Sequence, residues 1–486
     1  MTSIPVAAAR AASVVPNPNP GLHRTDFGAP EANILIARID VHPDLSAAEQ
    51  MPRGPERKAA VYDALVRTAQ SSQQDAMGVL SKLRSAGDVT AVESMVLPNA
   101  ILVTTAPGRH QAVADALAGV AHVQSVSQNR TWSMDAATGA DLVGSTPGFV
   151  VPDPDGRAVD GVDAIASGVA RIHAPDAWSA GADGTGVTVG VVDTGLDSAH
   201  ALIASHYRGT NADGTQSHDY NWFDPFTHAA TPYDDGEHGT HVAGTIAGGD
   251  AGSAIGVAPG AKLIAAKGIN GRGFNTTAAT LQALQFMLAP TKTDGSAPDP
   301  RRGADIINNS WGNADQRDET FLESMHALEA AGIEVVNAAG NDGPREGTVS
   351  PPGSYPGFFS VAATTDGDSV ASFSSRGPSK FTAPGELTPV VAAPGVNISS
   401  AKPGGGTQRM SGTSMAAPHV AGALALLLQA HPQATHAQLL AALTSTAVDV
   451  DKPGVDNASG YGRIDVAKAL AKLDALLGAS LIAPAA

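Results

Sequence analysis

Hydrophobic and polar positions divide the chain into two parts with different periodicities. In the first part, short apolar runs with strand composition alternate with stretches in which apolar residues recur at helical spacing. The strand-like runs cover residues 34–41, 89–96, 101–105 and 123–126, and the helical spacing covers residues 57–84 and 111–118. The order βαββαβ predicts a small split-βαβ sheet with helices on one face. Residues 1–28, rich in Ala, Pro and Asn, are expected to form a disordered lead-in.

The second part, from about residue 168 onwards, has a longer alternation of buried strands and helices. The expected strands are 187–192, 262–266, 306–307 and 333–336, and the expected helices are 238–248, 277–288 and 414–429. Strands that alternate with helices favour an α/β fold with a mostly parallel sheet covered on both faces. Between the two parts, residues 131–167 are rich in Gly, Pro and Asp, and we expect an exposed linker there.

Composition limits the classes of function. Of the 486 residues, 43% are hydrophobic and only 4% aromatic, which is enough to build a large core from Ala, Val and Leu. The net charge of −17 argues against nucleic acid or an anionic membrane as a partner. The absence of cysteine excludes disulfides, thiolate catalysis and cysteine-ligated metals. The sequence contains no run of 18 or more apolar residues, so we expect no membrane span.

Three short segments carry side chains suited to acyl transfer. In GVTVGVVDTGLD, Asp193 closes an apolar strand, and the carboxyl edge of a parallel sheet is where α/β proteins place functional groups. In EHGTHVAGT, His238 opens a helix, and a neighbouring carboxylate would hold its imidazole in one tautomer. In MSGTSMAAPHVAG, Ser414 begins a helix, whose free N–H groups and dipole favour a developing oxyanion. Pro418 is expected to fall in the first turn, which tolerates proline.

Each segment alone also has a plainer interpretation. Asp193 alone is more simply a residue of a solvated turn, and Ser414 alone an N-cap. A lone histidine is usually structural, and His238 with His241 at i, i+3 could form a metal pair, although the HExxH pattern and a third ligand are missing. The three segments become specific only together, in the order Asp, His, Ser.

Together, VVDTGLD, HGTHVAGT and GTSMAAPHVAG resemble the active-site motifs of the subtilisin-like serine proteases, peptidase family S8. The resemblance covers residues 169–476, and YNWFDP, PYDDGEHGTH and APGAKLIAAKGINGRGF are most similar to the bacillopeptidase F-like branch. It implies a subtilisin-like three-layer α/β/α fold and a serine endopeptidase that needs no cofactor for its chemistry. It also implies that Asp193, His238 and Ser414 form the catalytic triad.

Further site residues follow from the same resemblance. NAAGND contains Asn341, which matches the oxyanion-hole asparagine of the family and is otherwise a plain turn residue. INNSWG resembles the segment that lines the primary specificity pocket, and NGRGF the segment that pairs with an extended substrate, although both could be simple turns. A tryptophan replaces the aliphatic residue of many relatives, which suggests an apolar preference. The matching residues are Ser310, Trp311 and Gly312 in the first segment and Gly271 and Gly273 in the second.

Calcium binding stays open at this point. The segment after HVAGTIAG is short and lacks the insertion that forms a strong calcium loop in many relatives. Asp234, Asp235 and Glu237 form either a cation site or, as the simpler interpretation, a solvated acidic turn.

The N-terminal βαββαβ unit resembles the inhibitor-type propeptide of these enzymes. Residues 29–130 are therefore expected to form a ferredoxin-like α+β domain that occupies the substrate groove until the chain is cut within 131–167. An ordinary appended domain is the alternative. The catalytic domain is expected at 168–478, followed by a tail at 479–486. Protein or peptide substrates and the chain's own propeptide are the expected partners, and we expect a monomer.

Two alternatives to a secreted protease remain. The N-terminal residues contain neither a continuous apolar stretch nor a twin arginine, so no secretory signal is recognised, and a cytoplasmic regulatory protease is one alternative. The propeptide-like domain favours export instead. The other alternative is a catalytically silent, protease-like binding module, although all four catalytic positions are intact.

Overall fold

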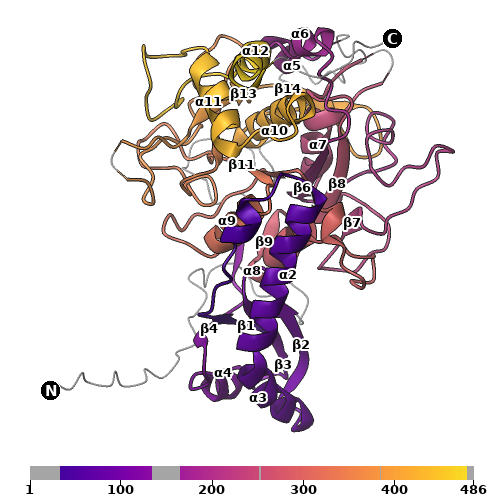
Figure 1. Ribbon diagram of the computed structural model, residues 1–486, viewed down its shortest axis with the longest axis vertical. Helices are drawn as coiled ribbons and strands as arrows, with labels where there is room; N and C mark the ends of the chain where they lie inside the picture. Colours follow the sequence, from indigo (N-terminus) through magenta and orange to yellow (C-terminus); the bar gives the residue numbers. More distant parts are fainter. Residues whose placement is uncertain (1–32, 134–164, 251–252, 384, 479–486) are drawn as a thin grey trace.

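The computed structural model describes residues 33–133, 165–250, 253–383 and 385–478 (Figure 1). The predicted lead-in at 1–28, most of the predicted linker and the tail at 479–486 lie outside these residues. Two bodies are built on separate sheets, a smaller body on a four-stranded sheet and a larger body on a seven-stranded sheet.

The sheet of the smaller body is antiparallel, with the strand order β2-β3-β1-β4. Successive side chains of a strand point to opposite faces. Leu35 and Ala37 therefore enter a core with α3 and α4, whereas Ile36 enters a core shared with the larger body. This is the predicted split-βαβ arrangement. Its elements are β1 (Ile34–Ile39), α1 (Ser46–Glu49), α2 (Pro55–Ser72), α3 (Gln74–Ser85), β2 (Val89–Met95), β3 (Ala100–Thr105), α4 (His110–Leu117) and β4 (Val123–Gln128).

The single helix predicted over 57–84 is instead the two helices α2 and α3, which meet at Gln73. The buried carboxamide of Gln73 donates hydrogen bonds to Asn99 Oδ1 at 2.8 Å and to the Met95 carbonyl at 3.1 Å. These hydrogen bonds hold the junction between α2 and α3 against the small sheet. Apolar residues on either side of Gln73 then face different cores: Leu65 packs toward the larger body, and Leu80 packs under the small sheet.

The larger sheet is entirely parallel, with the order β13-β12-β11-β10-β6-β8-β7. Val189 and Val191 of β6 face one helical layer with α7 and α10, and Val192 faces the opposite layer with α8 and α9. The predicted three-layer α/β/α fold is therefore confirmed. The strands are β6 (Thr188–Asp193), β7 (Trp222–Phe223), β8 (Lys262–Lys267), β10 (Ile306–Asn309), β11 (Glu334–Ala338), β12 (Phe359–Thr364) and β13 (Val391–Pro394).

Three α-helices of the larger body begin at residues whose side chains cap them. Thr276 accepts a hydrogen bond from the Ala279 N–H and begins α8, and Thr435 and Gln438 form a capping box at α11. Asp465 caps α12 in the same way. The helices of the larger body are α5 (Ser167–Arg171), α6 (Ala174–Ser179), α7 (His238–Ala247), α8 (Thr277–Leu288), η2 (Pro300–Arg302), α9 (Leu322–Ala330), α10 (Thr413–Ala430), α11 (His436–Thr446) and α12 (Val466–Leu477).

Both ends of the predicted linker at 131–167 belong to regular elements. β5 (Thr131–Ser133) pairs antiparallel with β9 (Phe274–Thr276) of the larger body, with Trp132 opposite Asn275, and α5 begins at Ser167. A second two-stranded sheet joins β14 (Ile398–Ala401) to β15 (Thr407–Met410). The strand β5 therefore ties the smaller body to one edge of the larger one.

The helix α10 is long and apolar enough to cross a membrane by length and composition alone. However, 94% of that stretch is buried inside the protein, among the side chains of α7, α12 and the sheet. It is therefore a core helix. In the part of the chain that the structure describes, it is the one helix that passes this test.

Candidate active site

The carboxyl edge of the large sheet joins two of the predicted catalytic residues directly. Asp193 is the last residue of β6, and His238 is the first residue of α7. The Nδ1 atom of His238 is hydrogen-bonded to Asp193 Oδ1 at 2.8 Å. The two side chains are 6% and 0% exposed, so solvent hardly screens the pair. Because this contact uses Nδ1, Nε2 is the imidazole nitrogen that can face a reacting group.

Ser414, the third predicted catalytic residue, is held at the same edge by the strand next to β6. Its hydroxyl donates to the Ser310 carbonyl at 3.1 Å, and the Ser310 hydroxyl donates to the Ser414 carbonyl at 2.9 Å. Ser310 directly follows β10, whose Asn309 is the parallel partner of Val192 in β6. The residue after Val192 is Asp193. The register therefore brings Ser310, and with it Ser414, to the end of the sheet where Asp193 lies.

Pro418 explains why the Ser414 carbonyl is available to Ser310. The helix α10 begins at Thr413, so Pro418 is its sixth residue and lies beyond the first turn in which it was expected. In a regular helix the N–H of residue 418 would donate to the carbonyl of residue 414, and proline has no N–H. The Ser414 carbonyl thus has no partner within the helix, and the Ser310 hydroxyl takes that place.

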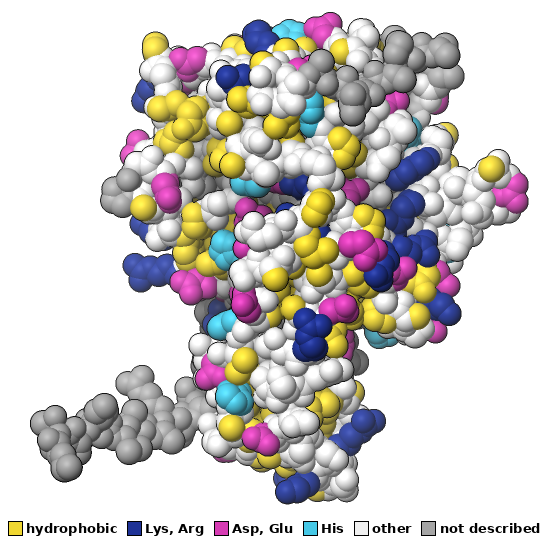
Figure 2. Space-filling view, in the orientation of Figure 1, with side chains coloured by type: hydrophobic (Ala, Val, Ile, Leu, Met, Phe, Trp, Pro, Cys, Tyr) yellow, Lys and Arg dark blue, Asp and Glu magenta, His cyan; other side chains and the backbone are white. Residues whose placement is uncertain are grey.

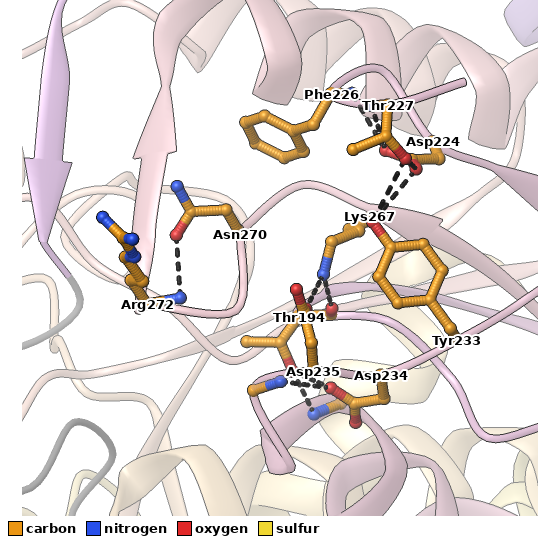
Figure 3. Close-up of polar contacts among 12 residues, drawn as sticks. Thr194, Asp224, Phe226, Thr227, Tyr233, Asp234, Asp235, Lys267, Asn270 and Arg272 are labelled. Atoms are coloured by element: carbon orange, nitrogen blue, oxygen red, sulfur yellow. Dashed lines mark hydrogen bonds and ion pairs between the residues drawn. The ribbon is translucent and has the colours of Figure 1, made fainter. Parts of the chain in front are cut away.

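Hydrogen bonds to Asp234 hold together the segments next to Asp193 and His238, and Figure 3 shows Asp234 beside Thr194. The carboxylate of Asp234 accepts from Thr194 Oγ1 at 2.8 Å, from the Thr240 N–H at 2.8 Å and from the Thr240 hydroxyl at 2.7 Å. The Thr194 hydroxyl oxygen in turn accepts from the Gly239 N–H at 2.8 Å. The residue after Asp193 is thereby bound to the residue after His238, which fixes the relative position of the two side chains.

The sequence of α7 also allows its first turn to touch β6 directly. A Cβ atom placed on Gly239 would lie 2.2 Å from the Gly195 carbonyl oxygen and 3.2 Å from the Asp193 Cβ. Real side chains do not approach a backbone atom so closely. Glycine at this position is therefore a requirement of the short distance between His238 and Asp193.

A buried lysine lies beside Asp193, and Figure 3 shows it with Thr194, Tyr233 and Asp235. Lys267 is the cross-strand neighbour of Asp193, and its side chain is 1% exposed. The ammonium group donates to the Thr194 carbonyl and to the Asp235 carboxylate, and it lies 4.7 Å from the centre of the Tyr233 ring. Burial raises the pKa of Tyr233 to about 12, so that ring stays neutral beside the cation.

The structure shows what the side chains of the acidic segment, Asp234, Asp235 and Glu237, contact. Asp234 and Asp235 direct their carboxylates to protein donors, whereas the side chains of Asp235 and Glu237 are also exposed to solvent. His241 is fully buried, and its Nε2 is hydrogen-bonded to the Ile398 carbonyl at 2.9 Å rather than arranged with His238 around a metal. Within the described ranges, no group of three or more His, Asp or Glu side chains could hold a metal ion.

Asn341 lies beside the start of α10. Its Oδ1 accepts from the Thr413 N–H at 2.9 Å and from the Thr413 hydroxyl at 3.0 Å. Because the N–H of Thr413 can only donate, the oxygen of the carboxamide must face it, and Nδ2 is turned to the opposite side. The N–H of Ser414, the second residue of α10, belongs to the first turn and has no partner within the helix. A Cβ placed on Gly412 would lie 3.6 Å from both Asn341 Nδ2 and the Ser414 nitrogen, so the two donors lie close to each other.

Gly271 and Gly273 form a tight loop immediately before β9. The Asn270 side chain holds this loop by accepting from the Arg272 N–H at 3.0 Å (Figure 3). Gly273 has a φ of +77°, which favours glycine. A Cβ on Gly271 would lie 2.2 Å from Asp235 Cγ, so the loop packs tightly against the segment that precedes His238. The adjoining edge at β9 already carries an added strand, β5.

The predicted specificity-pocket residues follow β10. Trp311 is 3% exposed and packs edge-on against Phe321, with ring centres 5.4 Å apart. Trp132 of β5 packs on the same Phe321 at 5.5 Å. A Cβ on Gly312 would lie 2.9 Å from the Ser350 hydroxyl. The indole of Trp311 therefore belongs to an aromatic cluster, and the apolar preference of the pocket stays a prediction.

Comparison with known proteins agrees with this geometry. A sequence model of the Subtilase family, Peptidase S8, matches residues 184–462. The chain belongs to the subtilase family. It is 35% identical to Bacillopeptidase F of Bacillus subtilis over 421 residues, which are 84% of this chain but only 28% of that relative. It is 36% identical to Subtilisin E of the same organism over 62% of this chain and 71% of the relative, and 37% identical to Subtilisin of Bacillus pumilus over 58% and 90%. The predicted resemblance is thereby confirmed.

Four supporting residues of this subtilase site were not predicted from the sequence. Thr194 and Thr413 lie next to predicted catalytic residues inside the matched motifs, so their position was a usable signal. Asp234 stood out only as part of an acidic segment. Lys267 ends the apolar run LIAAK, and nothing in the local pattern indicates that its charge is buried beside Asp193.

Replacing Gly239 tests the close contact between α7 and β6. In Gly239→Ala, the added methyl group would push His238 away from Asp193, and we expect kcat/KM on a peptide substrate to fall at least about 100-fold. Gly78→Ala is the matched control: it lies in α3 with no atom within 4 Å of the added Cβ, and it should raise the free energy of unfolding by about 0.5–1 kcal/mol. A Gly239→Ala protein with unchanged kcat/KM would contradict this account.

Two buried histidines predict how stability depends on pH. Burial lowers the pKa of His241 to about 3 and that of His419 to about 4, whereas in the unfolded chain both titrate near the ordinary value of about 6.5. Below that ordinary value the unfolded state binds more protons, so stability falls on acidification. Together, the two histidines are expected to lower the free energy of unfolding by about 2–3 kcal/mol when the pH falls from 7 to 5.5.

Urea unfolding of a Ser414→Ala protein at the two pH values measures this change without self-digestion. Replacing His419 by glutamine should reduce the pH dependence, whereas the same change at the exposed His326 should leave it unaltered. Equal stability of the parent protein at pH 7 and pH 5.5 would show that these imidazoles are not held neutral by the fold.

Proposed function

We propose that this chain is a serine endopeptidase that cleaves peptide bonds through an acyl-enzyme intermediate. The observation that carries this proposal is the buried hydrogen bond between His238 and Asp193, at the sheet edge where Ser414 is also held. The names of the relatives, which are bacillopeptidase and subtilisins, support the same activity. Because the chain matches only 28% of the length of Bacillopeptidase F, its substrates are proposed from its own site alone.

In the proposed first step, His238 acts as the general base. The Ser414 hydroxyl turns from the Ser310 carbonyl to Nε2 of His238 and gives up its proton as its oxygen attacks the peptide carbonyl. Asp193 holds the imidazole in the tautomer with hydrogen on Nδ1 and stabilises the imidazolium that forms. The imidazolium then protonates the leaving amine, and water resolves the acyl-enzyme.

The oxyanion of each tetrahedral intermediate is proposed to lie between Asn341 Nδ2 and the Ser414 N–H. Thr413 fixes the carboxamide by donating twice to its oxygen, so the amide donor needs no reorganisation as charge develops. The N–H of Ser414 adds the favourable end of the α10 dipole. No cofactor takes part in these steps.

We further propose that the smaller body is an inhibitory propeptide. The strand that follows its sheet, β5, pairs with β9 beside Gly271 and Gly273, where an extended substrate would add a strand. Apolar side chains of its sheet also share a core with α8 and α9. Cutting the chain between Ser133 and Ser167 would break the covalent connection between this body and the catalytic domain. Such a propeptide favours export, and fractionation of the native source distinguishes export from a cytoplasmic location.

The Ser414→Ala variant tests both hydrolysis and self-processing. We expect the wild-type chain to lose roughly its first 130 to 165 residues and the variant to stay at full length, because the nucleophile is missing. Intact mass spectrometry follows the cut, and a fluorophosphonate probe should label the wild type alone. A wild-type protein that is neither labelled nor cut would favour a catalytically silent binding module, and identical processing of both proteins would exclude self-maturation.

The Asn341→Ala variant tests the oxyanion donor. We expect kcat to fall by about 10²–10³, the loss measured when this donor is removed from subtilisin itself, with a small change in KM. The reason is that the lost hydrogen bond forms only as charge develops. Labelling of Ser414 by the fluorophosphonate probe should slow as well. A loss confined to KM would mean that Asn341 binds substrate rather than the oxyanion.

A further inference from the structure

The smaller body contacts the larger one at a second place, far from the strand pair β5–β9. The helix α2 extends from the small sheet along the larger body, and residues 53–58 at its start contact the amino-terminal edge of the large sheet (Figure 1). Asp305 and Glu334 at this edge directly precede and begin the neighbouring strands β10 and β11. A strand rises about 3.3 Å per residue, so the five steps from Asp305 to Ser310 separate this edge from the catalytic edge by about 16 Å.

The ligands that the larger body offers to the three basic side chains of this turn are all hydrogen-bond acceptors. Lys58 is 3% exposed, and its ammonium donates to Asp305 Oδ1 at 2.6 Å and to the Gly303 carbonyl at 2.9 Å. Arg53 donates to Glu334 Oε1 at 2.5 Å and also to the Gly332 carbonyl. In these buried contacts the larger body offers carboxylates and carbonyls, and the smaller body offers cations. At the exposed rim the direction is reversed, because Arg301 of the larger body donates to Glu56 at 3.0 Å.

A third cation, Arg57, satisfies the end of a helix. Its Nε donates to the Ala330 carbonyl at 2.7 Å, where α9 ends and its last carbonyls have no partner within the helix. The negative end of the α9 dipole favours a cation there. Gly332 has no side chain, and a Cβ at that position would lie 3.3–3.5 Å from the stems of Arg53 and Arg57. The surface thus admits the two arginines side by side.

The buried carboxylate of Glu334 shows how closely the two bodies depend on each other here. Its side chain is 2% exposed and is shared between Arg53 of the smaller body and His436 Nδ1 of the larger body, at 2.7 Å. Removing one partner of a buried ion pair leaves the other charge buried and unpaired, which costs far more than an exposed pair does. Figure 2 shows basic and acidic side chains side by side on this face, where the smaller body meets the larger one.

We propose that Asp305, Glu334 and the carbonyls of Gly303, Ala330 and Gly332 form a docking surface for a basic helical turn, separate from the substrate groove. We call it the acidic cradle. Its occupant is the turn Arg53–Lys58 of the chain's own N-terminal body, and it keeps that body bound as a separate chain after the linker is cut. The inference rests on the proposed zymogen, because only cleavage turns the N-terminal body into a separate partner.

The test uses the full chain carrying Ser414→Ala, with a recognition sequence for a site-specific protease inserted between residues 140 and 160. After cleavage by that protease, the two fragments should elute together in size-exclusion chromatography at low micromolar concentration. In Arg53→Met with Lys58→Met, we expect the fragments to separate and their affinity to fall at least about 100-fold. Arg67→Met with Lys82→Met removes the same charge from exposed positions and should leave the affinity unchanged within about twofold.

A substitution in the larger body excludes the explanation that binding is lost because the N-terminal body has misfolded. Asp305→Asn removes the charge that faces Lys58, and its amide oxygen can still accept from the Thr188 N–H. If the cradle acts as proposed, Lys58→Met weakens binding less in the Asp305→Asn background than in the parent. Wild-type fragments that separate on cleavage, or cradle variants that bind as tightly as the exposed control, would overturn the inference. The proposed function would survive either result, because this experiment requires no hydrolysis by Ser414.

Discussion

The hydrogen bond between His238 and Asp193 is the contact on which the proposed chemistry depends. It joins the end of a buried strand to the first residue of a helix, and neither element could hold this distance alone. Asp234 and Thr194 bind the two loops to each other, and the absence of a side chain at Gly239 lets the helix approach the strand. The histidine is thus oriented before any substrate arrives, which is the condition under which an electrostatic site costs little to use.

Much of the larger body could be predicted because its signals are local. The bounds of α8 agree with the predicted range 277–288, and the three motifs fall at a strand end and at two helix starts. Features decided by tertiary contacts were missed. Gln73 breaks a continuous helical pattern because its carboxamide is bound by the neighbouring sheet. Lys267 can be buried because the Thr194 carbonyl and the Asp235 carboxylate accept hydrogen bonds from its ammonium group. The residues that flank Gln73 and Lys267 in the sequence do not indicate these hydrogen-bond partners.

Pro418 illustrates a different kind of error. The pattern located the helix correctly but placed its start one residue late, and a proline was then explained by the free N–H groups of the first turn. Whether the helix starts at residue 413 or 414, the proline lies beyond the first turn and removes the N–H that would donate to the Ser414 carbonyl. The meaning of the proline depends on Ser310, a residue about one hundred positions away in the chain, and so could not be read from the helix alone.

The exchange of hydrogen bonds between Ser310 and Ser414 has a consequence for how the nucleophile keeps its place. The helix α10 is eighteen residues long, whereas β10, which leads to Ser310, is paired on both sides in the middle of the seven-stranded sheet. By anchoring the main chain of the reacting serine to the strand rather than to its own helix, the fold takes the coordinates of that oxygen from its most rigid part. Substitutions elsewhere along α10 can then adjust packing while the point of attack stays where it is.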